Sequence, residues 1–350
     1  MGPFELIQKG ISHDNSAMTT PFLSPVAAPT DGHLLAMSGI TQLPHLGVIR
    51  AAGDEAARFL QGQLTQDIAG LTQEQASLAA FCNSKGRMQA SFVVFNVKNT
   101  EGTDDILLVC SRDLLAQTLK RLGMFVLRAK VKLSDASDDF LLYGVSGAAA
   151  HSLIATKSEA TCAHIHWAKH VFGNQTTIQL YPGAGVDRAL WCAPAGTAPP
   201  AGQALSLSHW QWLEVQAGIA MVTLPIFEAF VPQMLNYESV GGVNFKKGCY
   251  PGQEGVARSQ FRGTLKRRAY LAHVAAAPAV GQEVFHASDA EQPCGLVAAA
   301  AANPSGGFDA IVSMQTSAAA NTAPGQLMLG SASGAALTLL PLPYALIEDI

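Results

Sequence analysis

The sequence predicts an α+β fold that ends in a β-rich domain. Residues 46–147 alternate between strand-like and helix-like segments, with hairpins between strands, which is typical of an α+β domain rather than a doubly wound parallel sheet. After residue 268, short apolar segments recur between Gly, Pro, Asn and Ser, a pattern that predicts a small antiparallel barrel or sandwich. No apolar run reaches the roughly 18 residues that a bilayer span requires.

The first half of the chain contains clear strand and helix signals. LGVIRAA, at 46–52, predicts a strand, and GDEAARFLQGQL then carries apolar residues at helical spacing. SLAAFCNSKGRMQASFVVFNV predicts two strands joined by a turn at 83–86, where Gly86 can adopt a positive φ. DDILLVC predicts a further strand and RDLLAQTLKRLGMFV an amphipathic helix. Two more strands are expected in VKLSDAS and FLLYGVSG.

The second half begins with a linker-like loop at 193–203 and a helix, SHWQWLEVQAGIA. Residues 223–243 contain Pro and Gly turns but little periodicity, so they predict a long loop with ordered contacts. Loops of that length inside a compact domain are often functional.

The overall charge is low: the 350 residues carry a net charge of −4. Such a balance favours neither nucleic acid nor an anionic membrane, so direct nucleic-acid binding is not expected. The first 22 residues lack a basic segment followed by an apolar one, so no secretory signal is expected. A soluble, cytoplasmic protein is the expectation.

The six cysteines form no CxxC pair, which disfavours a zinc ribbon or a dithiol redox motif, and disulfides are not expected. Five of them have neighbours typical of buried cysteines. Cys249 differs, because it lies in NFKKGCYPGQEG beside cationic and polar residues. The hypothesis is a reactive or ligand-exchanging thiol, since a cation such as Lys247 stabilises the thiolate and Gly248 and Gly252 allow sharp turns. The alternative is a packed cysteine among solvated lysines.

Other charged groups allow functional and structural interpretations. Arg258 and Arg262 are candidates for binding an anion, whereas Lys266–Arg268 are expected to form a solvated strand edge. Glu254 is positioned to pair with Arg258. His164, His166 and His170 have a spacing that can bind metal, but a surface strand is the favoured interpretation and no metal site is expected. One cysteine also cannot hold an iron–sulfur cluster, which needs about four ligands.

Several motifs together resemble a known family. FKKGCYPGQE, with FVPQMLN and GGVNF before it and VARSQFRG after it, is similar to the signature of the YgfZ-type folate-binding proteins, in the superfamily of the glycine-cleavage T-protein, an aminomethyltransferase. GDEAARFLQGQLTQDI, FCNSKGRM and PLPYALIED extend the resemblance from about residue 46 to the end. It implies three domains in a ring around a folate-binding hole: residues 1–53 with 140–262, a ferredoxin-like domain at 54–139, and a β-barrel at 263–350.

The resemblance also implies site residues. Trp210 would stack on the pterin, and Gln216 replaces a pterin-binding glutamate of the enzymes. A second tryptophan of the YgfZ site falls near Leu46 and is missing. The remaining candidates for folate contacts surround the two motifs: Lys85, Arg87, Gly252, Gln253, Glu254, Arg258 and Arg262. Ala90 and Ser91 occupy the positions of an aspartate pair that the aminomethyltransferases use.

The implied function is that of a folate-binding accessory protein that supports iron–sulfur enzymes, including a tRNA methylthiolation enzyme. Tetrahydrofolate or a derivative is the expected cofactor, and Cys249 with Lys247 the chemical centre, without turnover of its own. One alternative is a tetrahydrofolate-dependent one-carbon transfer enzyme that uses a different acid or base. Another is an interaction scaffold whose pocket is empty.

Overall fold

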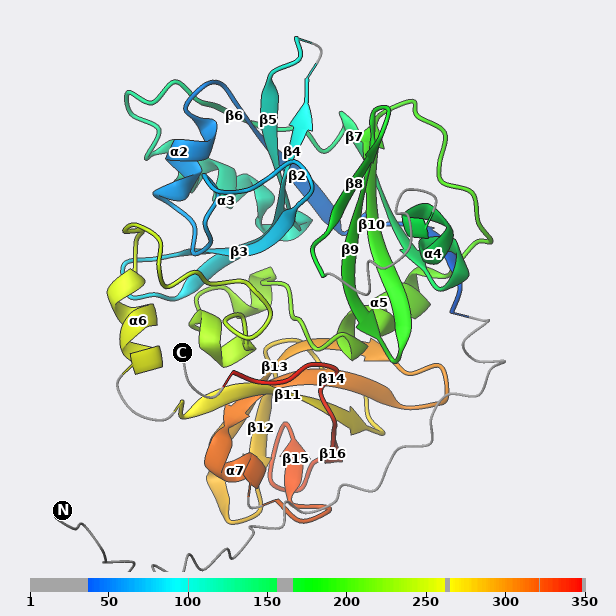
Figure 1. Ribbon diagram of the computed structural model, residues 1–350. Helices are drawn as coiled ribbons and strands as arrows, with labels where there is room; N and C mark the ends of the chain where they lie inside the picture. Colours follow the sequence, from blue (N-terminus) through cyan, green and yellow to red (C-terminus); the bar gives the residue numbers. More distant parts are fainter. Residues whose placement is uncertain (1–36, 100, 156–165, 262–264, 321, 348–350) are drawn as a thin grey trace, which may run out of the picture.

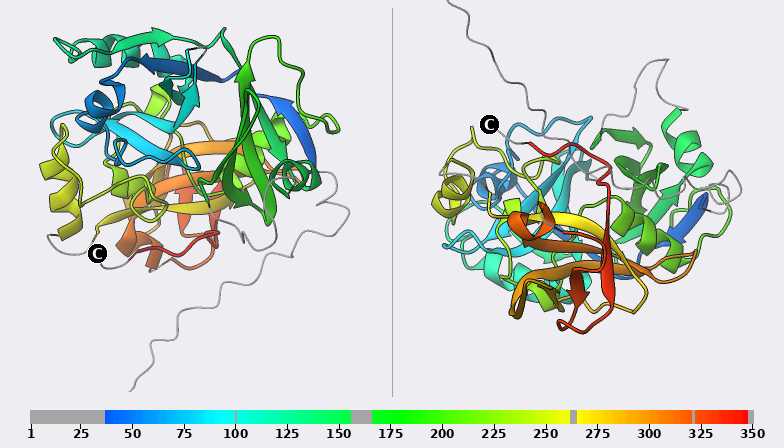
Figure 2. Two further views of the ribbon diagram at one scale, coloured as in Figure 1. Left: turned by 45° about the horizontal axis from the view of Figure 1, so that its top comes forward. Right: turned by 90° about the horizontal axis from the view of Figure 1, so that it is seen from below.

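The computed structural model describes residues 37–99, 101–155, 166–261, 265–320 and 322–347. Three β-sheets lie around a common centre, with two open sheets above a barrel (Figure 1). Seen from below, in the right-hand view of Figure 2, the barrel lies in front of the two open sheets. Among the described residues, no helix combines the length and the hydrophobicity that crossing a membrane requires.

The first sheet has the expected ferredoxin-like arrangement with one additional edge strand. Its antiparallel order is β3-β4-β5-β2-β6. The strands are β2 (Leu46–Ala52), β3 (Ala76–Cys82), β4 (Met88–Lys98), β5 (Asp104–Ser111) and β6 (Lys132–Asp135). Helices α2 (Ala56–Gln61) and α3 (Arg112–Gly123) bury apolar residues such as Leu60 and Leu115 in one cluster with Ile49 and Phe92 of the sheet. The apolar positions of α3 recur at helical spacing because only one face of it is covered.

The position of β2 corrects the expected grouping of residues 1–53 with 140–262. β2 pairs with β5 and β6, so it belongs to the sheet of the ferredoxin-like unit. Val48 and Ile49 point to opposite faces and are both fully buried. The backbone N–H and C=O groups of such a buried strand must be paired along both edges, and β5 and β6 supply these hydrogen bonds.

The second sheet has the antiparallel order β1-β7-β10-β9-β8. Its strands are β1 (Gly39–Gln42), β7 (Phe140–Ser146), β8 (Lys169–Phe172), β9 (Gln175–Gly183) and β10 (Val186–Pro194). Helices α4 (Ala148–Ala155) and α5 (Leu207–Gln216) accompany it. The Ser206 hydroxyl caps α5 by accepting a hydrogen bond from the His209 amide. Only residues 43–45 separate β1 from β2, so the chain crosses between the two sheets there.

The C-terminal barrel is closed, as expected, with the strand order β11-β14-β13-β12-β15-β16. Its strands are β11 (Arg267–Val274), β12 (Glu283–His286), β13 (Asp289–Ala302), β14 (Phe308–Gln315), β15 (Leu327–Leu329) and β16 (Ala336–Leu340), and α7 (Thr316–Ala320) follows β14. The predicted long loop contains two short 3-10 helices, η1 (Leu224–Ile226) and η2 (Pro232–Leu235). Helix α6 (Gln253–Phe261) begins with the last two residues of the KGCYPGQE motif.

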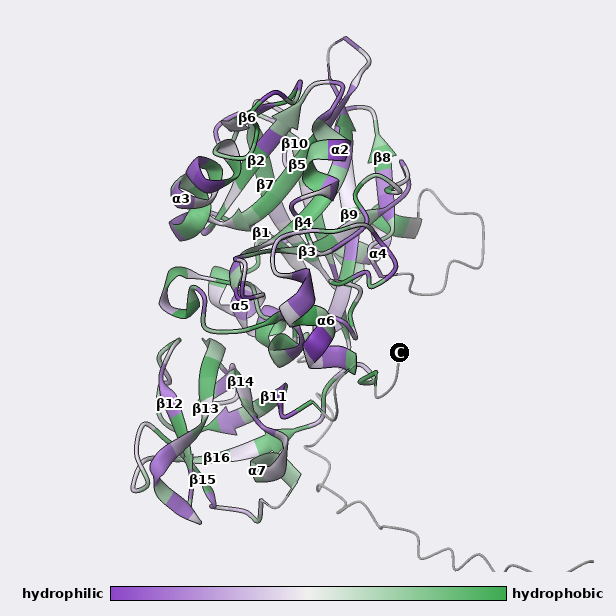
Figure 3. Ribbon diagram, turned by 90° about the vertical axis from the view of Figure 1, so that its left-hand side faces the viewer, coloured by the Kyte–Doolittle hydropathy of each residue, from purple (hydrophilic) through white to green (hydrophobic). Residues whose placement is uncertain are grey.

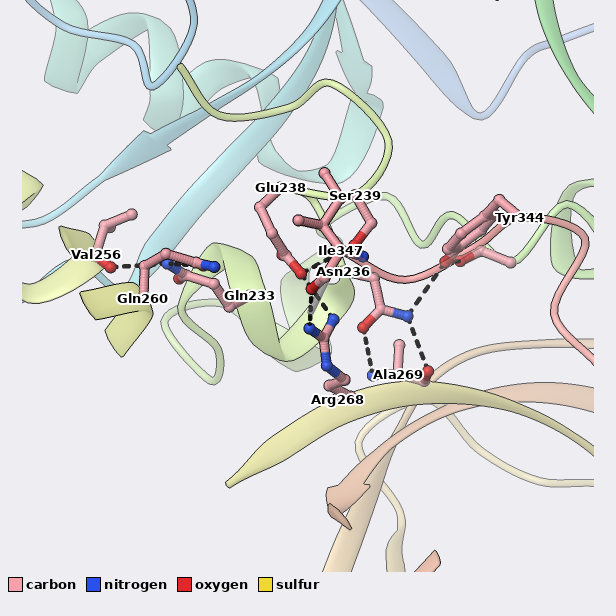
Figure 4. Close-up of polar contacts among 11 residues, drawn as sticks. Gln233, Asn236, Glu238, Ser239, Val256, Gln260, Arg268, Ala269, Tyr344 and Ile347 are labelled. Atoms are coloured by element: carbon pink, nitrogen blue, oxygen red, sulfur yellow. Dashed lines mark hydrogen bonds and ion pairs between the residues drawn. The ribbon is translucent and has the colours of Figure 1, made fainter. Parts of the chain in front are cut away.

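Arg268 on β11 corrects the expectation of a solvated strand edge. Its guanidinium group is buried and donates to Glu238 Oε1 at 2.7 Å and to the carbonyl of Ile347 at 2.6 Å (Figure 4). Asn236 pairs through its side chain with both backbone groups of Ala269. These contacts join the long loop to the barrel, and because a buried charge needs a partner, Glu238 and Arg268 depend on each other.

Candidate functional site

A cavity of about 280 Å³ lies where the two open sheets, α5 and the barrel meet. Its walls are mainly apolar and come from all four parts. They include Leu46 of β2, Val93 of β4, Leu180 of β9, Val215 of α5 and Ala299 of β13. A concave site with apolar walls and a few polar groups is the usual form of a small-molecule pocket.

Three charged or titratable side chains meet in this cavity. Glu214 of α5 lies 3.9 Å from Arg188 Nη2 and 3.5 Å from His45 Nε2, measured from its two carboxylate oxygens. Among the described residues, Glu214 is the only carboxylate in the cavity wall. Burial lowers the pKa of Arg188 to about 10, while Glu214 acts in the opposite direction, so the guanidinium remains charged at neutral pH.

Several polar atoms of this cluster are buried without a hydrogen-bond partner in the described part of the chain. They are both ring nitrogens of His45 and the Nε of Arg188. Buried polar atoms are nearly always paired, so His45 Nδ1 and Arg188 Nε are available to a polar ligand, whereas His45 Nε2 already lies 3.5 Å from Glu214. The cavity therefore combines apolar walls with polar atoms that a ligand could engage.

Trp210, expected to stack on the ligand, does not line the cavity. Its side chain is 1% exposed, and the Arg188 guanidinium lies 4.5 Å from its ring centre. On β7, a Cβ at Gly144 would lie 2.5 Å from the indole ring, so the backbone packs directly against the tryptophan. Arg188, not Trp210, presents its polar group to the cavity.

Gln216, expected at the pterin edge, points to the barrel instead. Its amide donates to Asp309 Oδ2 at 2.7 Å, and the same oxygen accepts from the Trp212 indole at 2.6 Å. Asp309 is fully buried and also contacts His273 and Asn303. Gln216 therefore holds α5 to the barrel, and Glu214, two residues earlier, faces the cavity.

Ala90 and Ser91, at the positions where the aminomethyltransferases carry an aspartate pair, point in opposite directions. Ser91 lines the cavity, where its hydroxyl accepts a hydrogen bond from the Val222 amide at 2.9 Å. Ala90 is buried in the cluster beneath α2 and α3. A hydroxyl that already accepts from the backbone supplies neither the charge nor the basicity of a carboxylate.

Cys249 is exposed and lies outside the cavity wall. The other cysteines in the described part of the chain, Cys82, Cys110, Cys192 and Cys294, are buried, and burial raises the thiol pKa of each. Cys162 lies outside the described residues. Cys249 is thus the accessible thiol within the described ranges, whereas the expected proximity to a pterin cavity is not seen.

The Lys247 ammonium group is held by backbone carbonyls. Its ammonium donates to the backbone carbonyls of Gln61 at 2.5 Å, Leu64 at 2.6 Å and Gln66 at 3.2 Å. All three N–H donors are used, one at the last residue of α2, where the helix dipole favours a cation, and two in the segment that follows the helix. Burial lowers the pKa of Lys247 to about 8, and Asp67 opposes this shift. Lys247 therefore links the KGCY segment to α2 and the segment after it, and its activation of Cys249 stays a prediction.

The glycine of the motif serves backbone packing. Gly252 has φ +80°, and a Cβ there would lie 2.3 Å from the Asn83 carbonyl. A Cβ at Gly255 would lie 2.8 Å from the Lys85 carbonyl. The turn after β3 and the start of α6 thus meet backbone to backbone, which explains why both quoted motifs contain glycine.

The other predicted contacts also lie outside the cavity wall. Gln253 and Glu254 begin α6, and Glu254 pairs with Arg258 at 2.5 Å, both exposed. The Arg87 guanidinium donates to the Ala229 carbonyl. Lys85 is exposed at the hairpin turn. Arg262 lies outside the described residues.

The histidine cluster forms no metal site in the described ranges, where no group of three or more potential ligands occurs. The His166 ring stacks on Tyr181, with ring centres 3.8 Å apart. His164 lies outside the described residues.

Comparison with known proteins places the chain in a family. The tRNA-modifying protein YgfZ of Cronobacter sakazakii is 31% identical over 340 residues, which cover 94% of this chain and 99% of the relative. The chain belongs to the YgfZ family. The YgfZ of Yersinia enterocolitica is 29% identical over 345 residues, covering 95% and 99% of the two chains. A scan against models of protein families finds no match.

A solved structure supports the fold of this YgfZ-family chain. Aminomethyltransferase T of the glycine cleavage system from Bartonella henselae matches with a TM-score of 0.60 and 16% identity. The match covers 90% of this chain and 89% of that one. The three-domain T-protein fold expected from the sequence is thereby confirmed.

Sequence reasoning missed the polar cluster of the cavity. One signal was present: Glu214 is the only charged residue between His209 and Glu228, in an otherwise apolar stretch. A lone carboxylate there indicates either a buried pair or a ligand site. No comparable signal marks His45 or Arg188.

Proposed function

We propose that this chain is a folate-binding accessory protein that supports iron–sulfur enzymes and tRNA modification. The observation that carries the proposal is the central cavity, in which Glu214 and Arg188 meet among apolar walls. Membership of a family whose relatives are named tRNA-modifying proteins supports the link to tRNA. An iron–sulfur enzyme that methylthiolates tRNA is the kind of partner this function requires.

The cavity suits the pteridine ring of tetrahydrofolate or a derivative. A pterin has apolar faces and one edge with amino and N–H donors next to a carbonyl oxygen. The Glu214 carboxylate would accept hydrogen bonds from these donors. Arg188 would donate to the carbonyl oxygen, and His45 would form a further hydrogen bond along the same edge. At about 280 Å³ the cavity holds the ring system, and the tail of the folate would extend towards its opening.

Cys249 would act outside the folate cavity, on a partner rather than on the bound folate. Its exposure allows exchange with a thiol, a sulfur atom or a metal of another protein, and the buried cysteines do not compete for it. Folate binding and thiol chemistry would thus occupy separate places on the chain.

One-carbon transfer is the second candidate function, and Glu214 favours it. A carboxylate in the cavity wall could take up or release a proton, although the aspartate position of the aminomethyltransferases is Ser91. Formation of methylenetetrahydrofolate from an aminomethyl donor would establish this function. Its absence, with folate bound, would favour the accessory role.

Titration calorimetry with tetrahydrofolate tests the cavity. We expect the native chain to bind and Glu214→Gln to bind at least about tenfold more weakly, because a hydrogen bond to a charged group contributes about 1.5–3 kcal/mol. Glu254→Gln is the matched control, since Glu254 is an exposed carboxylate outside the cavity. Equal affinity of the two variants would contradict the proposed site.

Cys249→Ala tests the accessory role in cells that lack their own YgfZ. We expect unchanged folding and folate affinity but reduced activity of iron–sulfur enzymes and less methylthiolated tRNA. Full complementation by Cys249→Ala would show that the thiol is not used.

A further inference from the structure

A basic and apolar surface lies at the end of α3 and in the segment that leads to β6. Residues 114–134 contain five cations and no acidic residue, although the chain as a whole carries a net charge of −4. The cations are Lys120, Arg121, Arg128, Lys130 and Lys132, and all are exposed. Met124, Phe125 and Leu127 lie between them, 60%, 45% and 89% exposed. These eight residues are called the α3–β6 surface here.

The five cations of the α3–β6 surface have few partners in the protein: Arg121 lies 5.5 Å from the ring centre of Phe227, and the Glu55 carboxylate accepts a hydrogen bond from the backbone amide of Lys130. In the described part of the chain, none of the five forms an ion pair, whereas the neighbouring Arg58 and Arg112 do. Ala129, Val131 and Leu133 pack against the apolar cluster of the first sheet, so the alternate residues Arg128, Lys130 and Lys132 face outward. Figure 3 shows α3, with hydrophilic and hydrophobic stretches side by side, at an edge of the molecule.

The apolar members of the surface are not explained by folding. Leu127 adopts φ 43°, a left-handed conformation that is costly for a residue with a side chain, and its exposed side chain recovers no burial energy. Phe125 contacts Phe81 edge to face, with ring centres 6.4 Å apart, yet almost half of its surface remains open. An exposed aromatic ring next to unpaired cations is a combination that nucleic-acid-binding surfaces use.

Lys85 lies at the hairpin turn, outside the cavity wall, and is exposed. The pKa of Glu228 is lowered mainly by a hydrogen bond from Gln89, and also by the charges of Arg121 and Lys85. Both cations therefore lie near one carboxylate, at the junction of the α3 end and the hairpin turn. The same turn packs against Gly252, three residues after Cys249.

We propose that the α3–β6 surface binds the phosphate backbone of tRNA, with Phe125 available to stack on an unpaired base. The proposal rests on the proposed link to tRNA modification and names a direct contact for it. A protein partner is less favoured, because interface cores are depleted of lysine and three of these five cations are lysines. The low net charge of the whole chain had disfavoured nucleic acid, but a local cluster sets the field within a Debye length of about 10 Å.

Fluorescence anisotropy with a labelled, unmodified tRNA transcript and the full-length chain tests this proposal. Each phosphate contact contributes roughly 0.7–0.9 to the slope of log affinity against log salt. Arg128→Gln with Lys130→Gln should lower that slope by about 1.4–1.8, which corresponds to about 25- to 60-fold weaker binding at 0.1 M salt. The control, Lys246→Gln with Lys266→Gln, removes the same charge from two exposed lysines elsewhere and should stay within about twofold of the native affinity.

Each remaining outcome overturns the proposal. The native chain could fail to bind tRNA at 50 mM salt, or the two double variants could weaken binding equally, which would indicate non-specific attraction. If the surface variant keeps its tRNA affinity while Leu127→Ser lowers tRNA modification in cells, the surface docks a protein instead.

Folate titration separates this result from the proposed function. Both double variants should keep native tetrahydrofolate affinity and thermal stability. Failure of the native chain to bind folate would overturn the proposed function and leave the tRNA result standing.

Discussion

Replacing Lys247 by Met removes an ammonium group that joins the KGCY segment to the end of α2. The side chain links the KGCY segment to three carbonyls, one at the end of α2 and two in the segment after it, so the variant leaves those acceptors to water or unpaired. Hydrogen bonds to charged groups contribute about 1.5–3 kcal/mol each when buried. Because Lys247 is only half-buried and its ammonium loses hydration, we expect a total loss of about 2–3 kcal/mol.

Hydrogen exchange at pH 7 measures this loss where it occurs. The amides of Leu64 and Thr65 donate to the carbonyls of Leu60 and Ala80, so they are protected in the native chain. A loss of 2–3 kcal/mol corresponds to about 30- to 150-fold faster exchange of these amides, since 1.4 kcal/mol is tenfold. Lys246→Met, at the exposed neighbouring position, is the control and should leave exchange unchanged.

Alkylation of Cys249 in the same variants completes the test. If Lys247 has a structural role, Lys247→Met speeds hydrogen exchange of these amides without slowing alkylation of the Cys249 thiol. If exchange were unchanged and alkylation of Cys249 became slower, Lys247 would activate the thiol and the structural interpretation would be wrong.

Three further substitutions test the contacts between domains. Asp309→Ala leaves four polar side chains in a buried site without their shared partner and should lower the free energy of unfolding by about 3–5 kcal/mol, measured as a lower Tm. A decrease below about 1 kcal/mol would contradict the network. Arg268→Met leaves Glu238 buried without its partner. Burial raises the pKa of Glu238, so protonation at low pH removes the penalty, and the loss of stability should be smaller at pH 5 than at pH 8. An equal loss at both pH values would argue against a buried charge. Gly252→Ala should destabilise the chain because its Cβ would clash with a backbone carbonyl, whereas Gly248→Ala, which meets open space, should not.

The fold could be predicted largely from local pattern. Alternating strand and helix signals placed the elements, and the short strands after residue 268 form the closed barrel. The membership of β2 was predicted wrongly, because a strand with both faces buried does not indicate which sheet it joins. Pairing partners depend on contacts that are distant in sequence, as with β2 and β5.

The site could be predicted only in part, and α5 shows the reason. Trp210, Trp212, Leu213 and Val215 are all buried on different sides of this helix, so no polar face indicates which side meets the cavity. The resemblance selected Gln216, but Asp309 of the barrel binds that amide and Glu214 faces the cavity. The exposure of Cys249 agrees with its polar neighbours, whereas the role of its lysine depended on carbonyls some 180 residues earlier.

A crystal structure of the complex with tetrahydrofolate would test the central claim most directly. We expect the pteridine ring in the central cavity, with its amino edge within hydrogen-bond distance of the Glu214 carboxylate and the Arg188 guanidinium against the same edge. A pteridine bound elsewhere, such as over Cys249, with Glu214 and Arg188 untouched, would contradict it.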